Sequence, residues 1–120
     1  LFYFVILCFF IAHLGASTAL KLDHFKPQRF QNVRSKFKLL CQLIEGSGGE
    51  LHFKWYKNGV PLRSTDHGHR LKIDHNQDES TLIIDQLVAT DSGNYSCEVE
   101  NNGEGQKGDA TFTVLTVKGL

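Results

Sequence analysis

From residue 37 onward, apolar and polar side chains alternate in short runs separated by turn-forming residues. Strict alternation places successive side chains on opposite faces of a strand. The pattern predicts no helix and seven short strands, which is typical of an all-β, two-sheet antiparallel sandwich. The expected inward positions are Phe37, Leu39, Cys41 and Leu43; Leu51, Phe53 and Trp55; Leu71 and Ile73; Leu82, Ile84 and Leu87; Tyr95, Cys97 and Val99; and Ala110, Phe112 and Val114.

The pair Asn58-Gly59 lies between the run that ends at Lys57 and the segment opened by Pro61. Both residues tolerate a positive φ angle, which a two-residue hairpin of the type I′ class requires. The sequence therefore predicts a tight hairpin at this point.

The first 19 residues differ from the rest because residues 1–12 form an uncharged apolar run, followed by small residues. Such a segment is typical of a secretory signal peptide, with cleavage expected between Ala19 and Leu20. The chain starts at Leu1 rather than Met, so we expect residues 1–19 to be an N-terminally truncated signal peptide. An uncleaved membrane anchor is the alternative.

Cleavage would remove Cys8 and leave Cys41 and Cys97. An even number of cysteines in a chain that enters an oxidising compartment predicts a disulfide. We therefore expect Cys41 and Cys97 to be bonded to each other and the protein to be secreted or on the extracellular face of the plasma membrane.

Cys41, Trp55 fourteen positions later, and the motif Asp91-Ser-Gly-Asn-Tyr-Ser-Cys97 occur in this order. This combination resembles the immunoglobulin superfamily. The resemblance implies that Trp55 packs against the inter-sheet disulfide and that Tyr95 makes the corner hydrogen bond. Asp91 and Gly93 are then structural residues of the same motif.

The 55 residues between the two cysteines leave room for a short C′ strand, which is similar to the I-set type. The resemblance predicts an immunoglobulin-like I-set domain over residues 26–117, after an N-terminal segment at 20–25 and before a C-terminal tail at 118–120, where truncation of the chain is an alternative to a natural end. The strand around Trp55 resembles those of neuregulin-like and neural adhesion immunoglobulin domains and does not distinguish between them.

Asn94-Tyr95-Ser96 is an N-glycosylation sequon. If Tyr95 and Cys97 point inward, Asn94 and Ser96 point outward. In the resembled fold, a glycan at Asn94 would lie on the sheet that holds the expected strands around Trp55, Tyr95 and Phe112 (strands C, F and G of that fold) and would restrict binding there. The alternative is that the sequon stays unused.

The zero net charge conceals an asymmetry. Residues 20–72 hold 11 Lys and Arg against four acids, and residues 73–120 hold two against nine. In the resembled fold, strands A, B, E and D share one sheet, whose outward face would carry Lys36, Lys38, Arg70 and Lys72. Such a basic face could bind a polyanion, for which heparan sulfate is the extracellular candidate. The alternative is an ordinary solvated face. Compartment and neutral total charge argue against nucleic acid.

The sequence shows no nucleophile in a recognisable motif, and we expect no catalytic residue, cofactor or small-molecule substrate. His67, His69 and His75 match no known metal-ligand spacing, so no metal is expected. A filled sandwich leaves its surface for recognition. We expect an extracellular or cell-surface protein partner, and homophilic contact is possible. The candidate contact residues are Lys54, Tyr56 and Glu98.

Two functions follow. The first is a recognition module of an adhesion or receptor protein. The second is a growth-factor or matrix-associated domain that binds heparan sulfate through its basic face.

Overall fold

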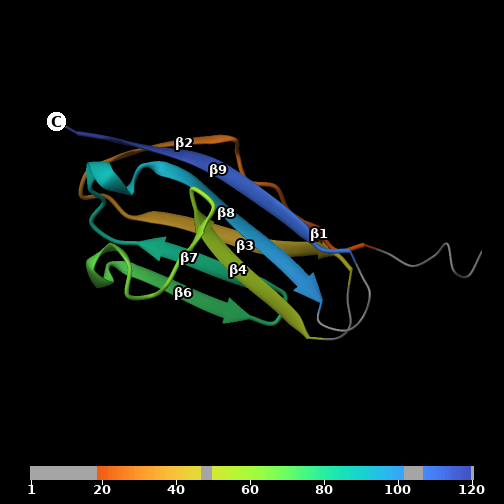
Figure 1. Ribbon diagram of the computed structural model, residues 1–120. Coiled ribbons are helices and arrows are strands. Elements are labelled where there is room, and N and C mark those ends of the chain that lie inside the picture. The colour runs from red at the N-terminus through yellow and green to blue at the C-terminus, as the bar shows by residue number, and fades with distance from the viewer. Residues whose placement is uncertain (1–18, 47–49, 102–106, 120) are drawn as a thin grey trace, which may run out of the picture.

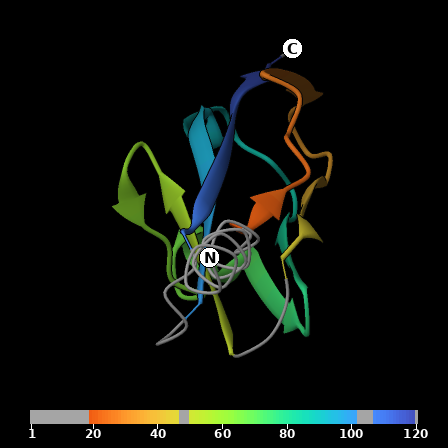
Figure 2. The same ribbon diagram turned by 90° about the vertical axis from the view of Figure 1, so that its right-hand side faces the viewer.

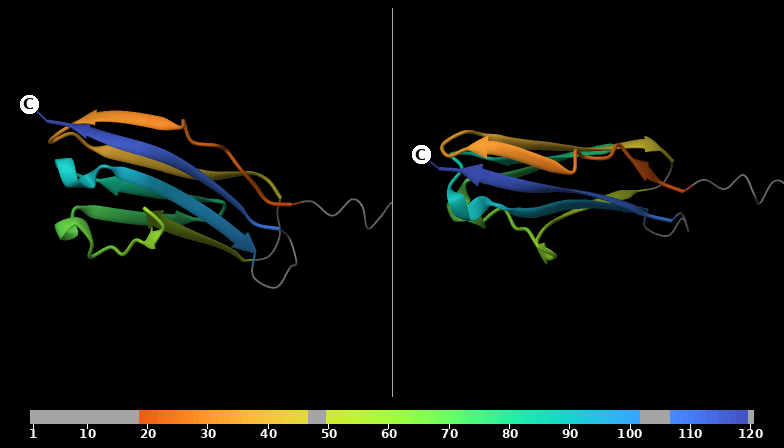
Figure 3. Two further views of the ribbon diagram at one scale, coloured as in Figure 1. Left: turned by 45° about the horizontal axis from the view of Figure 1, so that its top comes forward. Right: turned by 90° about the horizontal axis from the view of Figure 1, so that it is seen from above.

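The computed structural model describes residues 19–46, 50–101 and 107–119. These residues form two β-sheets that pack face to face (Figure 1). The orthogonal views separate the two layers (Figures 2 and 3). β1 (Lys21–Leu22) starts at one end of the sandwich, and the C-terminus lies at the other. The prediction of an all-β two-sheet sandwich is confirmed.

The strand order is β1-β3-β7-β6 in the four-stranded sheet and β2-β9-β8-β4-β5 in the five-stranded sheet. Among the described strands, every pairing is antiparallel except that of β2 with β9. The remaining elements are β2 (Gln28–Asn32), β3 (Phe37–Glu45), β4 (Leu51–Lys57), β5 (Val60–Pro61), β6 (Leu71–Asn76), β7 (Glu79–Ile84), β8 (Gly93–Asn101), β9 (Asp109–Lys118) and two 3-10 turns, η1 (His67–His69) and η2 (Ala89–Asp91).

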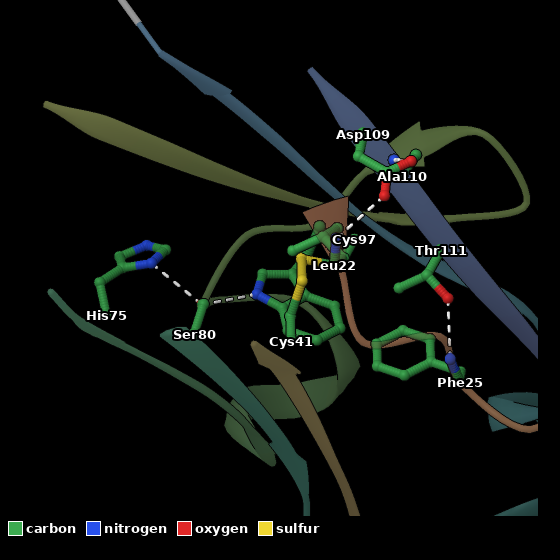
Figure 4. Close-up of a disulfide and its surroundings, with 10 residues drawn as sticks. Leu22, Phe25, Cys41, His75, Ser80, Cys97, Asp109, Ala110 and Thr111 are labelled. Carbon is green, nitrogen blue, oxygen red and sulfur yellow. Dashed lines mark hydrogen bonds between the residues drawn. A yellow bond between two sulfur atoms is a disulfide. The ribbon is translucent and has the colours of Figure 1, made fainter. Parts of the chain in front are cut away.

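The disulfide joins Cys41 of β3 to Cys97 of β8, and it therefore links the two sheets. Both cysteines are fully buried. Trp55 lies directly opposite Cys97 in the β4–β8 pairing and is almost completely buried. Figure 4 shows the disulfide and its surroundings. The expected pairing of the cysteines is confirmed.

The predicted hairpin at Asn58-Gly59 connects β4 to β5, where Lys57 pairs with Val60. The φ angle is 51° at Asn58 and 79° at Gly59. Two consecutive positive values are what the type I′ class needs, so the turn residues match the backbone that they adopt.

The expected orientation of the last strand is wrong. In β9 the buried side chains are Thr111, Thr113, Leu115 and Val117, whereas Ala110, Phe112 and Val114 are exposed. Both phases of this strand contain apolar residues, and pairing with β8 selects between them. The inward residue Cys97 lies opposite Thr111, and the inward residue Tyr95 lies opposite Thr113. Side chains directly opposite each other in a sheet share a face.

The N-terminal segment at 20–25 takes part in the fold. Leu20 and Leu22 are buried, and β1 pairs with β3. The chain then crosses to the other sheet, where β2 pairs with β9. β1 and β2 add to the seven strands expected from alternation. Alternation did not predict them, because β1 is only two residues long and β2 is mostly polar.

The expected signal peptide lies outside the described residues except for Ala19, and Leu120 of the expected tail is also outside them. In the part of the chain that the structure describes, no helix has the length and apolar character needed to cross a membrane.

Candidate binding surfaces

The outward side chains of the four-stranded sheet are called the β3 face, and those of the five-stranded sheet the β8 face. The structure places the residues predicted to have structural roles between these faces, and the predicted binding residues on them with one exception. That exception is Arg70, which precedes β6 and was expected to point outward.

The Arg70 side chain, which is partly buried, turns toward η2 and binds Asp91. Its guanidinium donates two hydrogen bonds to the Asp91 carboxylate, at 2.8 and 3.0 Å. The same group donates to the backbone carbonyls of Asp85 and Gln86. The guanidinium thus stabilises the segment that leads into η2 and is turned away from the β3 face.

Asp91 is 1% exposed, so its charge depends on these partners. Burial opposes ionisation, but hydrogen bonds from Arg70 and from the Val88 backbone N–H outweigh it and hold the pKa of Asp91 below its ordinary value. His67 of η1 lies 3.7 Å from the same carboxylate, measured from Nε2 to Oδ1. Burial lowers the pKa of His67, although the charge of Asp91 opposes this shift.

Tyr95 makes the corner hydrogen bond that the family resemblance implies, because its hydroxyl donates to the backbone carbonyl of Asp91. Trp55 Nε1 donates to Ser80 Oγ at 2.8 Å. Ser80 also lies 3.0 Å from His75 Nδ1, and Figure 4 shows this contact beside the disulfide. The buried polar atoms of both aromatic side chains are therefore satisfied.

The three lysines of the β3 face remain at its surface. Lys38 and Lys72 both lie opposite Ile83, one on each side of β7. Lys36 lies 3.4 Å from Asp85 and Lys72 lies 3.8 Å from Asp74, each measured between charged atoms. Acidic neighbours and an isoleucine therefore interrupt this basic face.

The β8 face brings together Lys54, Tyr56 and Glu98. Lys54 lies opposite Glu98 across the β4–β8 pairing, and Tyr56 lies opposite Ser96. Lys54 Nζ is 3.0 Å from a carboxylate oxygen of Glu100. The hydrogen bond to Glu100 and the charge of Glu100 raise the pKa of Lys54.

Sequence reasoning missed the apolar residues of this face. Phe112 is 60% exposed and Val114 is 42% exposed, both on β9, and Phe30 on β2 is 58% exposed. Phe112 lies opposite Ser96, so Tyr56, Ser96 and Phe112 form one row across three strands. The available signal was Lys118, which ends the Phe112 phase of the strand with a charge.

Asn94 is exposed on the same face, and two hydrogen bonds of its backbone attach its strand to the β4–β5 hairpin. The Asn94 N–H donates to the Asn58 side-chain oxygen at 2.8 Å, and the Asn58 N–H donates to the Asn94 carbonyl at 2.7 Å. Gly93 packs against this hairpin, because a Cβ atom there would lie 3.0 to 3.1 Å from side-chain atoms of Lys57 and Asn58.

Within residues 19–46, 50–101 and 107–119, no three His, Cys, Asp or Glu side chains are arranged to hold a metal ion. His67 belongs to the interior beside Asp91, and His75 contacts Ser80.

Two sheets joined by a buried disulfide, with a tryptophan opposite one cysteine and a tyrosine corner, define an immunoglobulin-like domain. Residues 27–114 match the model of the immunoglobulin I-set domain family. The chain belongs to this family.

Curated relatives share one domain-sized stretch with the chain. Pro-neuregulin-1, membrane-bound isoform, from Homo sapiens is 31% identical over 95 residues, which cover 79% of this chain and 14% of that protein. The MAM domain-containing glycosylphosphatidylinositol anchor protein 2 of Mus musculus is 36% identical over 75 residues, which cover 61% of this chain and 8% of that protein. The chain thus spans a small part of these relatives' length.

Solved structures show the same fold at low identity. The N-terminal Ig1-2 module of the Drosophila receptor protein tyrosine phosphatase DLAR has a TM-score of 0.67 at 19% identity, covering 85% of this chain and 50% of that one. Sidekick-1 immunoglobulin domains 1–4 have a TM-score of 0.64 at 23% identity, covering 82% and 24%. At these identities the likeness establishes the fold alone.

Proposed function

We propose that the chain is a non-enzymatic, extracellular protein-recognition module of the adhesion or receptor type. Its location is outside the cell, either secreted or on the extracellular face of the plasma membrane. Membership of the I-set family supports the recognition role. The disulfide supports the location, because disulfides persist in oxidising compartments.

The contact surface is the β4 side of the β8 face, centred on Lys54, Tyr56 and Glu98. The observation that carries this assignment is their arrangement on neighbouring strands of one open sheet face. A tyrosine beside charged residues supplies apolar area, a hydrogen-bonding group and charge within one patch. Aromatic residues of this kind are enriched at protein interfaces.

The partner is an extracellular or cell-surface protein, and a second copy of the chain is included in that class. Lys54 and Glu98 have opposite charges on one face, so two copies related by a twofold axis could pair Lys54 of one with Glu98 of the other. The proposed role requires no cofactor, nucleic acid or small-molecule substrate.

The test displays residues 20–120, which contain every described strand, in many copies on fluorescent beads. Bead aggregation measures homophilic contact, and binding to a panel of cell lines measures contact with other surface proteins. We expect the triple variant Lys54→Glu/Tyr56→Ser/Glu98→Lys to lose at least about tenfold in binding, because interface energy concentrates in a few residues.

The matched control is Lys38→Glu/Leu40→Ser/Lys72→Glu on the β3 face, which should bind as the native domain does. Binding that is lost in the control and kept in the first variant would move the contact to the other sheet. Absence of binding to beads and to every cell line would contradict the recognition role.

A second candidate function is heparan sulfate binding by a growth-factor or matrix-associated domain. The observation that favours it is that Lys38 is exposed and has no acidic neighbour among the described residues. In the described part of the chain, no carboxylate lies within ion-pair distance of this exposed lysine. Lys36 and Lys72 share its face and would complete the site.

A further inference from the structure

The β9 side of the β8 face has exposed apolar side chains next to the sequon. Val114 lies directly opposite Asn94, and Phe112 lies directly opposite Ser96. Opposite residues in an antiparallel pair have Cβ atoms roughly 4.5 to 5.5 Å apart. Both sequon side chains therefore stand beside an apolar neighbour on the same face.

Phe112 is the unusual member of this group because it is aromatic and 60% exposed. It lies between Val114 and Ala110 along β9, both of which are also exposed. Exposed apolar area that is contiguous marks a surface that another group covers. The covering group must reach the middle of β9 from a neighbouring point on the sheet.

Asn94 is a suitable point of attachment. Its side chain is exposed, and the two hydrogen bonds to Asn58 hold the backbone from which that side chain projects. A group joined to its amide nitrogen starts one strand away from Val114 and one residue pair away from Phe112.

We propose that Asn94 carries an N-linked glycan whose first N-acetylglucosamine packs on Phe112 and Val114. One face of this sugar presents C–H groups with slight positive charge, and its acetamide ends in a methyl group. The face of an aromatic ring is slightly negative and apolar, so it complements both. The glycan is thus part of the folded surface over β9.

The attachment uses an oligosaccharide donor linked to a lipid through a diphosphate, which secretory cells supply. The amide nitrogen of Asn94 forms a bond to C1 of the first sugar. The bond from C1 to the diphosphate oxygen breaks, the lipid diphosphate leaves with that electron pair, and the amide nitrogen loses one proton. No oxidant or reductant takes part.

The proposal divides the β8 face into two parts. The glycan covers β9, and the strand β4 with Lys54 and Tyr56 stays open on the other side of β8. The glycan contact stands on the β9 residues alone and does not depend on a partner at β4.

The test expresses the domain, behind a secretion signal, in cells that attach high-mannose glycans. Mass spectrometry of the intact protein locates the sugar at Asn94, and the variant Ser96→Ala should lack it. An endoglycosidase then trims the glycan to its first sugar, and the Ser96→Ala variant supplies the form without sugar, because enzymatic removal of the last sugar would convert Asn94 to Asp. We expect complete absence of the glycan to lower Tm by roughly 3 to 6 °C and trimming to leave Tm almost unchanged.

In the Phe112→Ser variant, the glycosylated and the sugar-free forms should have the same Tm, because the side chain on which the sugar packs is gone. The control Leu40→Ser changes another exposed apolar residue (43%, against 60% for Phe112) on the β3 face and should keep the full difference. A second readout is a nuclear Overhauser effect between the acetamide methyl and the Phe112 ring.

An unmodified Asn94 would overturn the proposal. So would an undiminished Tm difference in Phe112→Ser together with no Overhauser effect at the ring. Self-association of the native glycoprotein that Phe112→Ser abolishes would assign the patch to a second copy of the chain instead.

Discussion

The two outward faces of the sandwich differ in what their side chains contact. On the β3 face, Lys36 and Lys72 lie beside carboxylates. On the β8 face, Phe112 and Val114 are exposed at the surface. The sequence charge count drew attention to the first face, whereas the exposed aromatic side chain of Phe112 distinguishes the second from the first, whose exposed apolar residues Leu40 and Ile44 are aliphatic. A local excess of lysine therefore says less about binding than side-chain direction and neighbours do.

We expect the largest effect from replacing Arg70, because the sequence assigned this residue to the β3 face and the structure places it against Asp91. Removing one partner of a buried ion pair leaves an uncompensated charge. We expect Arg70→Ser to lower the free energy of unfolding by roughly 3 to 5 kcal/mol. Urea denaturation followed by tryptophan fluorescence measures this change.

Lys72→Ser is the matched control, since Lys72 is exposed on the same sheet and has only a weak ion pair. Its effect should stay within about 0.5 kcal/mol. If Arg70→Ser and Lys72→Ser change the free energy of unfolding by the same small amount, Arg70 behaves as a surface residue and the proposed role of its ion pair with Asp91 is wrong.

A change of pH tests the interior cluster by itself, because His67 lies in it, 3.7 Å from the Asp91 carboxylate. The pKa of His67 is lowered by burial, so protonation favours the unfolded chain. The stabilisation is complete above the unfolded value of about 6.5 and is lost as pH falls below it. Tm should therefore decrease as the pH falls from 7 to 5.

His67→Phe should reduce the dependence of Tm on pH in this window, and the exposed His69→Phe should not. Asp91 contributes a separate loss at lower pH, because its pKa lies below the ordinary value. An unchanged pH profile in His67→Phe would show that another histidine controls it.

The smallest expected effect is a change in heparin affinity when the lysines of the β3 face are replaced. This change measures how much the β3 face contributes to polyanion binding. If the face binds, replacing its three lysines lowers the slope of log affinity against log salt by about 2, because fewer counterions are released. The variant changes Lys36, Lys38 and Lys72 to Ser. A control with the same net charge changes Lys54, Lys107 and Lys118. If both variants elute from heparin at the same salt concentration, the β3 face is an ordinary solvated surface and does not bind heparan sulfate.

Features set by local chemistry could be predicted from the sequence. Asn58-Gly59 specifies its hairpin by itself, and the spacing of Cys41, Trp55 and Cys97 identifies the family and its disulfide. Alternation also gave the correct inward residues for β3, β4 and β8.

Features set by pairing between distant segments could not be predicted. Both phases of β9 are apolar, so only its register with β8 shows that Phe112 faces outward. Arg70 follows alternation as an outward residue, yet Asp91, 21 positions away, redirects its guanidinium. The polar strand β2 has no apolar periodicity, and its partner β9 defines it.

The parallel pairing of β2 with β9 has a mechanical consequence. The sandwich has β1 at one end and the C-terminus at the other, so tension applied to the two ends runs along its length. Five residue pairs, from Gln28 opposite Val114 to Asn32 opposite Lys118, then slide past each other in shear. Bonds loaded in shear share the force and break together, whereas an antiparallel hairpin pulled from its open end separates one pair at a time. Tension along this direction would therefore load the five β2–β9 pairs together and not one after another.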